Sequence, residues 1–103
     1  MIISGGFNVY PIDLENALVA HPAVVEAAVI AKPSNRWGET PVAFVTLKEG
    51  AVADPEALRA FANNSLGKTQ RIAQVTIIDA LPRSAIGKVL KRELQGRLAS
   101  ETG

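Results

Sequence analysis

The sequence predicts an α+β domain in which an N-terminal β-hairpin accompanies a small three-stranded sheet packed by about three helices. The first observation is the order of patterns along the chain: a glycine-centred hairpin, then helix, strand, strand, helix, strand and helix. The second is length, because 103 residues suit one compact domain and leave no room for two. Residues 1–103 are therefore expected to form a single domain.

The N-terminal part is predicted to be a hairpin followed by a helix. Ile2-Ile3 and Phe7–Tyr10 flank Ser4-Gly5-Gly6, and adjacent glycines supply the positive φ angles of a tight turn without steric strain. Pro11 suits the first turn of a helix, because its missing N–H has no partner there anyway. His21-Pro22 ends this helix.

Three runs rich in β-branched residues are predicted to form the sheet: Val24–Ala31, Val42–Leu47 and Val75–Ile78. Residues 32–39, between the first two runs, are interpreted as a polar connection. Two further helices are predicted. Asp54-Pro55-Glu56 provides an N-cap carboxylate and a proline for a helix that continues to about Leu66. The last helix is expected over Val89–Leu98, with a frayed tail after Ala99; its apolar stripe is Leu90, Leu94 and Leu98.

Composition excludes several classes of function. Eleven basic residues against ten acidic ones give a net charge of +1, and only five residues are aromatic, so no nucleic-acid partner is expected. The apolar runs are shorter than the ~18 residues of a membrane span, so no transmembrane segment is expected. The absence of cysteine excludes thiolate catalysis and most zinc sites, and it is consistent with a cytoplasmic protein.

Two motifs do not support a function. Residues 62–69 fit a relaxed phosphate-binding loop pattern, but the pattern ends a helix and leads into a strand, which is the reverse of the order that the mechanism requires. Gly67 is instead interpreted as a helix C-cap. His21 has neither an acidic orienting residue nor a nucleophile in its vicinity, and one histidine cannot form a metal site. No metal-binding residue is predicted in this chain.

The stretch from Leu81 to Lys88 contains the candidate for chemistry. Lys88 is expected near the start of the last helix, where the helix dipole disfavours a cation unless an anionic ligand compensates for it. Arg83, Lys91 and Arg92 make this end of the domain locally basic. The pattern alone fits two interpretations, an anion-binding loop or a surface loop with solvated cations.

Four stretches together resemble the C-terminal domain of the adenylate-forming superfamily, which comprises acyl-CoA synthetases, peptide-synthetase adenylation domains and luciferases. They occur in the family's order and cover nearly the whole chain: the glycine hairpin at 3–11, the helix-to-strand passage at 21–29, Arg36–Glu39, and the lysine motif at 81–94. The resemblance is closest to the acyl-CoA synthetase, or fatty-acid–CoA ligase, type.

The resemblance implies a two-step reaction: ATP and a carboxylate give an acyl-adenylate and pyrophosphate, and coenzyme A then displaces AMP. By motif, Lys88 would be catalytic in the first step. Gly5 and Gly6 would line the tunnel for coenzyme A after a rotation of the domain, and Arg83 and Gly87 would contribute to ligand binding in the lysine loop. Mg2+ would be bound by ATP and by a large N-terminal domain, which also binds the acid and is the expected partner of this chain.

The sequence departs from the family at Thr69-Gln70-Arg71-Ile72, where an aromatic-lysine pair and a proline are usual. The acidic run that contains the domain hinge is absent, and so is the large domain that binds ATP and the acid. The isolated chain is therefore expected to fold but not to turn over. Two alternatives are the corresponding part of a peptide-synthetase adenylation domain and a non-catalytic α+β domain that binds a small regulatory ligand. The helix that ends at Glu101-Thr102-Gly103, with no carrier domain after it, favours the free-standing ligase.

Overall fold

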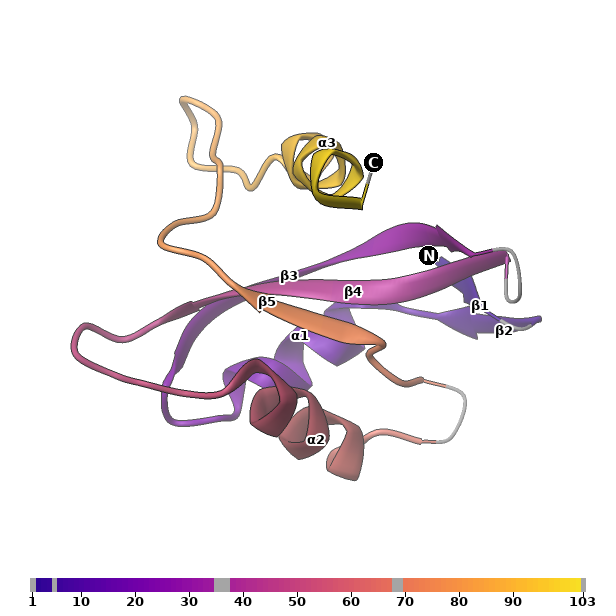
Figure 1. The fold of residues 1–103 in the computed structure, drawn as a ribbon, viewed down its shortest axis with the longest axis horizontal. Helices are drawn as coiled ribbons and strands as arrows, with labels where there is room; N and C mark the ends of the chain where they lie inside the picture. Colours follow the sequence, from indigo (N-terminus) through magenta and orange to yellow (C-terminus); the bar gives the residue numbers. More distant parts are fainter. Residues whose placement is uncertain (1, 5, 35–37, 68–69, 103) are drawn as a thin grey trace.

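One long strand, β4 (Gly38–Leu47), organises the sheet of this domain (Figure 1). The structure, a computed structural model, describes residues 2–4, 6–34, 38–67 and 70–102. β4 pairs antiparallel with β3 (Val24–Ser34) and parallel with β5 (Gln74–Ile77). The hairpin of β1 (Ile2–Ser4) and β2 (Phe7–Val9) joins the beginning of β4 through the pair Ser4↔Gly38.

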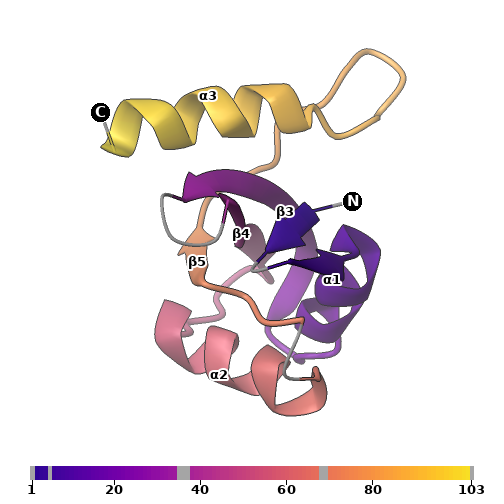
Figure 2. The ribbon, with the colours of Figure 1, turned by 90° about the vertical axis from the view of Figure 1, so that its right-hand side faces the viewer.

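Helices lie on both faces of this sheet. α1 (Pro11–Val19) and α2 (Pro55–Ser65) lie on one face, and α3 (Lys91–Thr102) crosses the other (Figure 2). Alternate residues of β4 therefore contribute to two cores. Ala43 and Val45 belong to the core beneath α1 and α2, and Val42 and Phe44 belong to the core beneath α3.

Both cores consist of apolar side chains that are almost fully buried. The larger contains Ile2, Val9, Leu14, Leu18, Val24, Val29, Ala43, Val45, Leu58, Ala62, Ile72 and Val75. The smaller contains Ala28, Ile30, Val42, Phe44, Ile78, Leu81 and Leu94. The smaller core anchors the segment after β5, because Leu81 and Leu94 bracket the loop that carries Lys88.

The predicted fold class is confirmed, and the predicted elements occur in the predicted order. The prediction of a polar connection over residues 32–39 is wrong at both ends, because β3 extends to Ser34 and β4 begins at Gly38. The ladder continues through Lys32↔Thr40 and Pro33↔Glu39 to Ser34↔Gly38, and residues 35–37 lie outside the described part. Pro33 is tolerated because β3 lies at the edge of the sheet, where a missing N–H breaks no ladder.

The last helix begins at Lys91 rather than at Val89, and it continues to Thr102 instead of fraying after Ala99. The later start has a local cause. Val89 forms an isolated antiparallel bridge with Arg83, which places the residues before Lys91 in a closed loop instead of a helical turn.

Candidate active-site loop

Residues 81–90 form a tight loop between β5 and α3, closed by backbone hydrogen bonds at three levels. The Leu90 N–H donates to the Pro82 carbonyl (2.8 Å) near the base of the loop. Ser84 donates its N–H to the Lys88 carbonyl (2.9 Å), and Gly87 donates its N–H to the Ser84 carbonyl (2.9 Å). Gly87 has a φ of +86°, a conformation that glycine adopts without strain. The backbone of the loop is therefore well defined up to its tip.

Lys88 lies in this loop, three residues before α3. Lys88 was expected near the start of a helix beginning at Val89, but the bridge at Val89 delays the helix, so the lysine lies outside its first turn. Its side chain is exposed, and it makes no ion pair or hydrogen bond with any described residue. An open depression lined by residues 88–93 lies beside it. The ammonium is therefore available to an anion brought by another molecule or domain.

Two of the neighbouring cations are already paired. Arg83 donates to the Gly87 carbonyl (2.7 Å) and forms an ion pair with Glu26 of β3. The Lys91 ammonium lies 2.9 Å from a carboxylate oxygen of Glu15 on α1. Carboxylates from other elements balance Arg83 and Lys91, two of the three cations expected to make this end basic, whereas Lys88 and Arg92 form no ion pair with a described residue.

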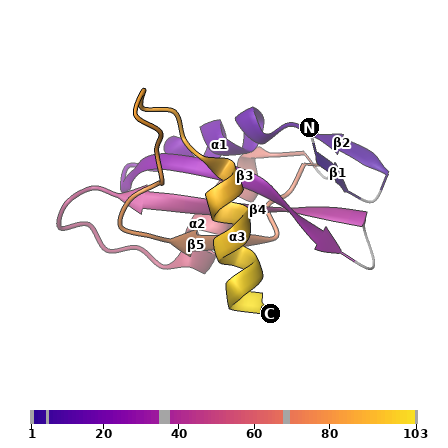
Figure 3. The same cartoon turned by 90° about the horizontal axis from the view of Figure 1, so that it is seen from above.

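The glycine hairpin lies away from the lysine loop, toward the opposite end of the molecule's long axis (Figures 1 and 3). Gly6 has a φ of +84° and is exposed, and a side chain added there would meet no atom within 4 Å. Gly5 lies outside the described residues. The hairpin contacts the beginning of β4, where the Ile3 N–H donates to the Glu39 carboxylate (3.1 Å).

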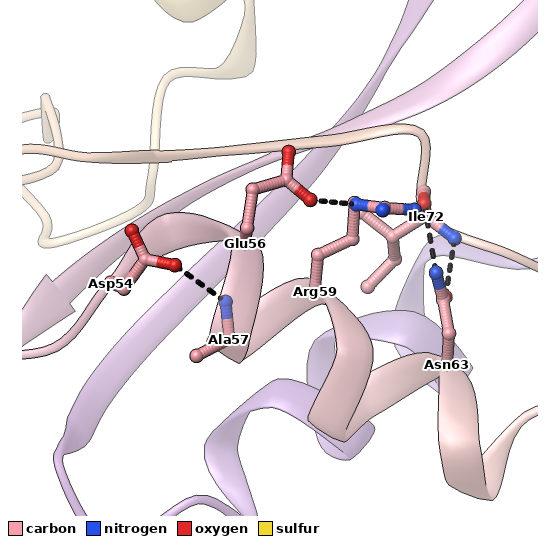
Figure 4. A network of polar contacts seen from close by, with 6 residues as sticks. All are labelled: Asp54, Glu56, Ala57, Arg59, Asn63 and Ile72. Atoms are coloured by element: carbon pink, nitrogen blue, oxygen red, sulfur yellow. Dashed lines mark hydrogen bonds and ion pairs between the residues drawn. The ribbon is translucent and has the colours of Figure 1, made fainter.

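The segment before β5, which departs from the family pattern, is fixed by a buried asparagine. The Ile72 N–H donates to Asn63 Oδ1 (2.8 Å), and Asn63 Nδ2 donates to the Ile72 carbonyl (3.0 Å), as Figure 4 shows. On the same helix the predicted N-cap is confirmed, because Asp54 accepts the Ala57 N–H (3.1 Å). The sequence analysis missed the role of Asn63, although a polar residue beside the buried Ala62 was a signal.

Within 2–4, 6–34, 38–67 and 70–102, no three His, Cys, Asp or Glu side chains come together in a way that could hold a metal ion. None of the helices in these ranges combines the length and the apolar character needed to cross a bilayer.

The fold and the loop define a small α+β domain that presents one unpaired lysine on a closed loop, at a distance from a glycine hairpin. The chain belongs to the AMP-binding enzyme C-terminal domain family, which matches residues 13–88. The predicted family is therefore confirmed. The match ends at Lys88.

Three relatives illustrate the similarity. The 2-succinylbenzoate–CoA ligase of Geobacillus kaustophilus is 48% identical over 99% of this chain, which corresponds to 21% of that ligase. The fatty acid–[acyl-carrier-protein] ligase ScoC of Streptomyces coeruleorubidus is 42% identical over 93% of this chain and 18% of its own length. The crystal structure of ATP-bound MatB from Rhodopseudomonas palustris matches with a TM-score of 0.89 and 37% identity, over 94% of this chain and 19% of that chain. This chain thus spans about a fifth of the length of these relatives.

Proposed function

We propose that this chain is the mobile C-terminal domain of a carboxylate–CoA ligase. Such an enzyme activates an acid with ATP to an acyl-adenylate and then transfers the acyl group to coenzyme A, releasing pyrophosphate and AMP. Support comes from the family, and from a relative named as a CoA ligase that is 48% identical over nearly the whole chain.

The observation that carries the proposal is the state of Lys88. Its main chain is tied to Ser84 on both sides, while its ammonium is exposed and unpaired among the described residues. Lys91, by contrast, is engaged by Glu15. A fixed backbone with an unpaired charge suits a group delivered to an anionic reaction centre on another domain.

In the first step, Lys88 acts by electrostatic stabilisation. A carboxylate oxygen forms a bond to the α-phosphorus of ATP as the bond to the pyrophosphate oxygen breaks. Two anions must approach each other, and an ammonium placed between their oxygens offsets the repulsion where charge accumulates. Lysine suits this role because it is a compact charge on a flexible stem. Loss of such a contact costs about 3 kcal/mol or more in that half-reaction.

In the second step, the glycine hairpin takes the place of the lysine loop. The loop and the hairpin lie toward opposite ends of the domain, so both can serve one active site only if the domain rotates between the steps (Figure 3). Gly6 has no side chain, which leaves its backbone open to close approach by a thiol-bearing arm. The same role for Gly5 stays a prediction, as does a ligand contact by Arg83 or Gly87.

The proposal includes substrates and partners that this chain does not hold by itself. ATP, coenzyme A and the acid would lie between this domain and a large N-terminal domain, and Mg2+ would be held by that domain and by ATP. The exposed ammonium of Lys88 fits the negative charge of such reactants. The cytoplasmic location expected from composition stays a prediction.

The acceptor thiol has a second candidate. ScoC, which is 42% identical to this chain, is named as a ligase for fatty acids and acyl-carrier protein. That name makes a thiol bound to a carrier protein the second candidate for the acyl acceptor, in place of coenzyme A. The two acceptors can be compared by supplying each to the same preformed acyl-adenylate and measuring thioester formation.

A chimeric ligase tests the proposed function. This chain replaces the matched segment of the 2-succinylbenzoate–CoA ligase of G. kaustophilus, and the two half-reactions are assayed separately. Adenylation is measured by pyrophosphate exchange, and thioesterification is measured from preformed adenylate. We expect both to exceed those of the remaining domain alone. Lys88→Ala should lower adenylation at least 100-fold, in keeping with about 3 kcal/mol, and should spare thioesterification.

Two results would contradict the proposal. One is a folded chimera that is no more active than the remaining domain alone. The other is an active chimera in which Lys88→Ala leaves adenylation unchanged. Tight binding of a small ligand by the isolated chain would instead favour the regulatory alternative, which requires a self-contained pocket.

A further inference from the structure

We infer that Glu26 is a positioning residue for Lys88. Its carboxylate, acting through Arg83, fixes the loop that carries the lysine, and it therefore supports adenylate formation without touching the reactants. This inference rests on the proposed function and extends it to a residue on a different element, 57 positions from Arg83 in the sequence.

The first observation is the geometry of Arg83. One guanidinium nitrogen donates to the Gly87 carbonyl (2.7 Å), and the other terminal nitrogen binds the Glu26 carboxylate. A guanidinium is planar and rigid, so two contacts on one group fix the relative placement of their partners. One partner is the peptide that joins Gly87 to Lys88, and the other is a strand of the sheet.

The second observation is that Glu26 belongs to a rigid element. Val24 and Ala28, two residues before and after it on β3, are 4% and 1% exposed. The lysine loop, in contrast, projects from the domain, and Ile86 at its tip is 88% exposed. Side chains on packed strands are held more precisely than those on loops. Through Arg83, Glu26 therefore ties the lysine loop to a packed strand of the sheet.

The third observation is the exposure of the ion pair. The Arg83 and Glu26 side chains are each 38% exposed, and partly exposed ion pairs contribute little to stability. The placement of a catalytic group has a much larger effect on rate than such a pair has on stability, because a shift of ~1 Å can lower a rate about 100-fold. The pair should therefore affect the position of Lys88 much more than the stability of the domain.

The charge balance supports the same role. Glu26 neutralises Arg83, which lies in the lysine loop, and Glu15 neutralises Lys91 at the start of α3. An incoming anion would therefore meet Lys88 and Arg92, which form no ion pair with a described residue, and not Arg83 or Lys91. Removal of Glu26 would both release the loop and free Arg83 to bind the anion in an unproductive place.

The experiment compares Glu26→Gln with Glu56→Gln in the chimeric ligase. Glu56 is the matched control, because it also pairs with an arginine, Arg59, but lies on α2 across the sheet from the lysine loop. We expect Glu26→Gln to lower adenylation about tenfold and to leave thioesterification within twofold, whereas Glu56→Gln changes neither.

A second measurement uses the 103-residue chain itself and needs no activity. The Gly87 and Lys88 N–H groups donate to the Ser84 carbonyl and hydroxyl, so their amide hydrogen exchange reports closure of the loop. Glu26→Gln should accelerate both severalfold with an unchanged melting temperature, and Glu56→Gln should accelerate neither.

The inference is overturned if Glu26→Gln behaves like Glu56→Gln in exchange and in adenylation, or if it lowers both half-reactions equally. Lys88→Ala in the same ligase separates this failure from that of the proposed function. If Lys88→Ala abolishes adenylation and Glu26→Gln has no effect, only the role of Glu26 is wrong. If Lys88→Ala has no effect, the proposed function fails as well.

Discussion

Ser84 binds the main chain of Lys88 on both sides. Its N–H donates to the Lys88 carbonyl (2.9 Å), and its hydroxyl oxygen accepts the Lys88 N–H (3.3 Å). The backbone of Lys88 is therefore held in place, whereas its side chain extends into solvent. Such an arrangement lets one residue reach an anion on another domain while losing little order at its backbone.

Ser84→Ala should weaken this attachment without unfolding the domain. It removes the hydroxyl contact and keeps the backbone bond, and a net hydrogen bond contributes about 1 kcal/mol. We expect adenylation in the chimeric ligase to fall roughly three- to tenfold. Ser84→Thr keeps the hydroxyl and should stay near the parent rate. Equal rates for the alanine and threonine variants would show that the hydroxyl has no role.

Gly6→Val should impair the second half-reaction alone. A valine at φ +84° is strained by about 1–2 kcal/mol, but its Cβ would lie in open space, with no atom beyond the adjoining residues within 4 Å. Gly50→Val is the matched control, because Gly50 has a φ of +79° and is equally open. Both variants should lose similar stability in urea denaturation, and only Gly6→Val should slow thioesterification of preformed adenylate. A similar loss in Gly50→Val would assign the effect to strain instead of to the thiol path.

Glu39→Ala should loosen the glycine hairpin. The Glu39 carboxylate accepts the Ile3 N–H (3.1 Å), and among the described residues the hairpin pairs with β4 at Ser4↔Gly38. We expect faster amide exchange at Ile3 and slower thioesterification, with adenylation unchanged. Glu39→Gln retains an acceptor oxygen and should restore most of the protection. Unaltered exchange at Ile3 in Glu39→Ala would contradict the role of this contact.

The sequence predicted the features that depend on local pattern. β-Branched runs located the strands, and Asp54-Pro55 located the start of α2, where the expected N-cap bond is present. The position of Lys88 relative to α3 was wrong because a bridge between Arg83 and Val89 competes with the first helical turn. Periodicity does not report such a bridge, since both residues also fit a loop or a helix.

The contacts that define the site could not be predicted from the sequence. Glu26 and Arg83 are 57 residues apart, and Glu15 approaches Lys91 from a helix on the other face of the sheet. In the sequence, each of these carboxylates has the pattern of an ordinary solvent-facing residue. Their pairing follows from tertiary packing, because only the folded sheet brings β3 and α1 beside the residues that flank the lysine loop.

The buried pair of Asn63 and Ile72 explains how the chain accommodates its departure from the family. A proline is usual just before the last strand of such domains and has no N–H. Ile72, the last residue of the stretch that departs from this pattern, is 1% exposed and has an N–H that must be satisfied. Asn63, itself 5% exposed, accepts that N–H and also donates to the Ile72 carbonyl.

Asn63→Leu should therefore be strongly destabilising. It leaves two buried backbone groups without partners, at about 1–3 kcal/mol each, so the free energy of unfolding should fall by roughly 2–6 kcal/mol. Asn64→Leu is the matched control on the next, exposed position of α2 and should change stability by less than about 0.5 kcal/mol. Urea denaturation of the 103-residue chain gives both values. Equal stabilities would mean that the Ile72 backbone finds other partners, and that the segment before β5 does not depend on Asn63.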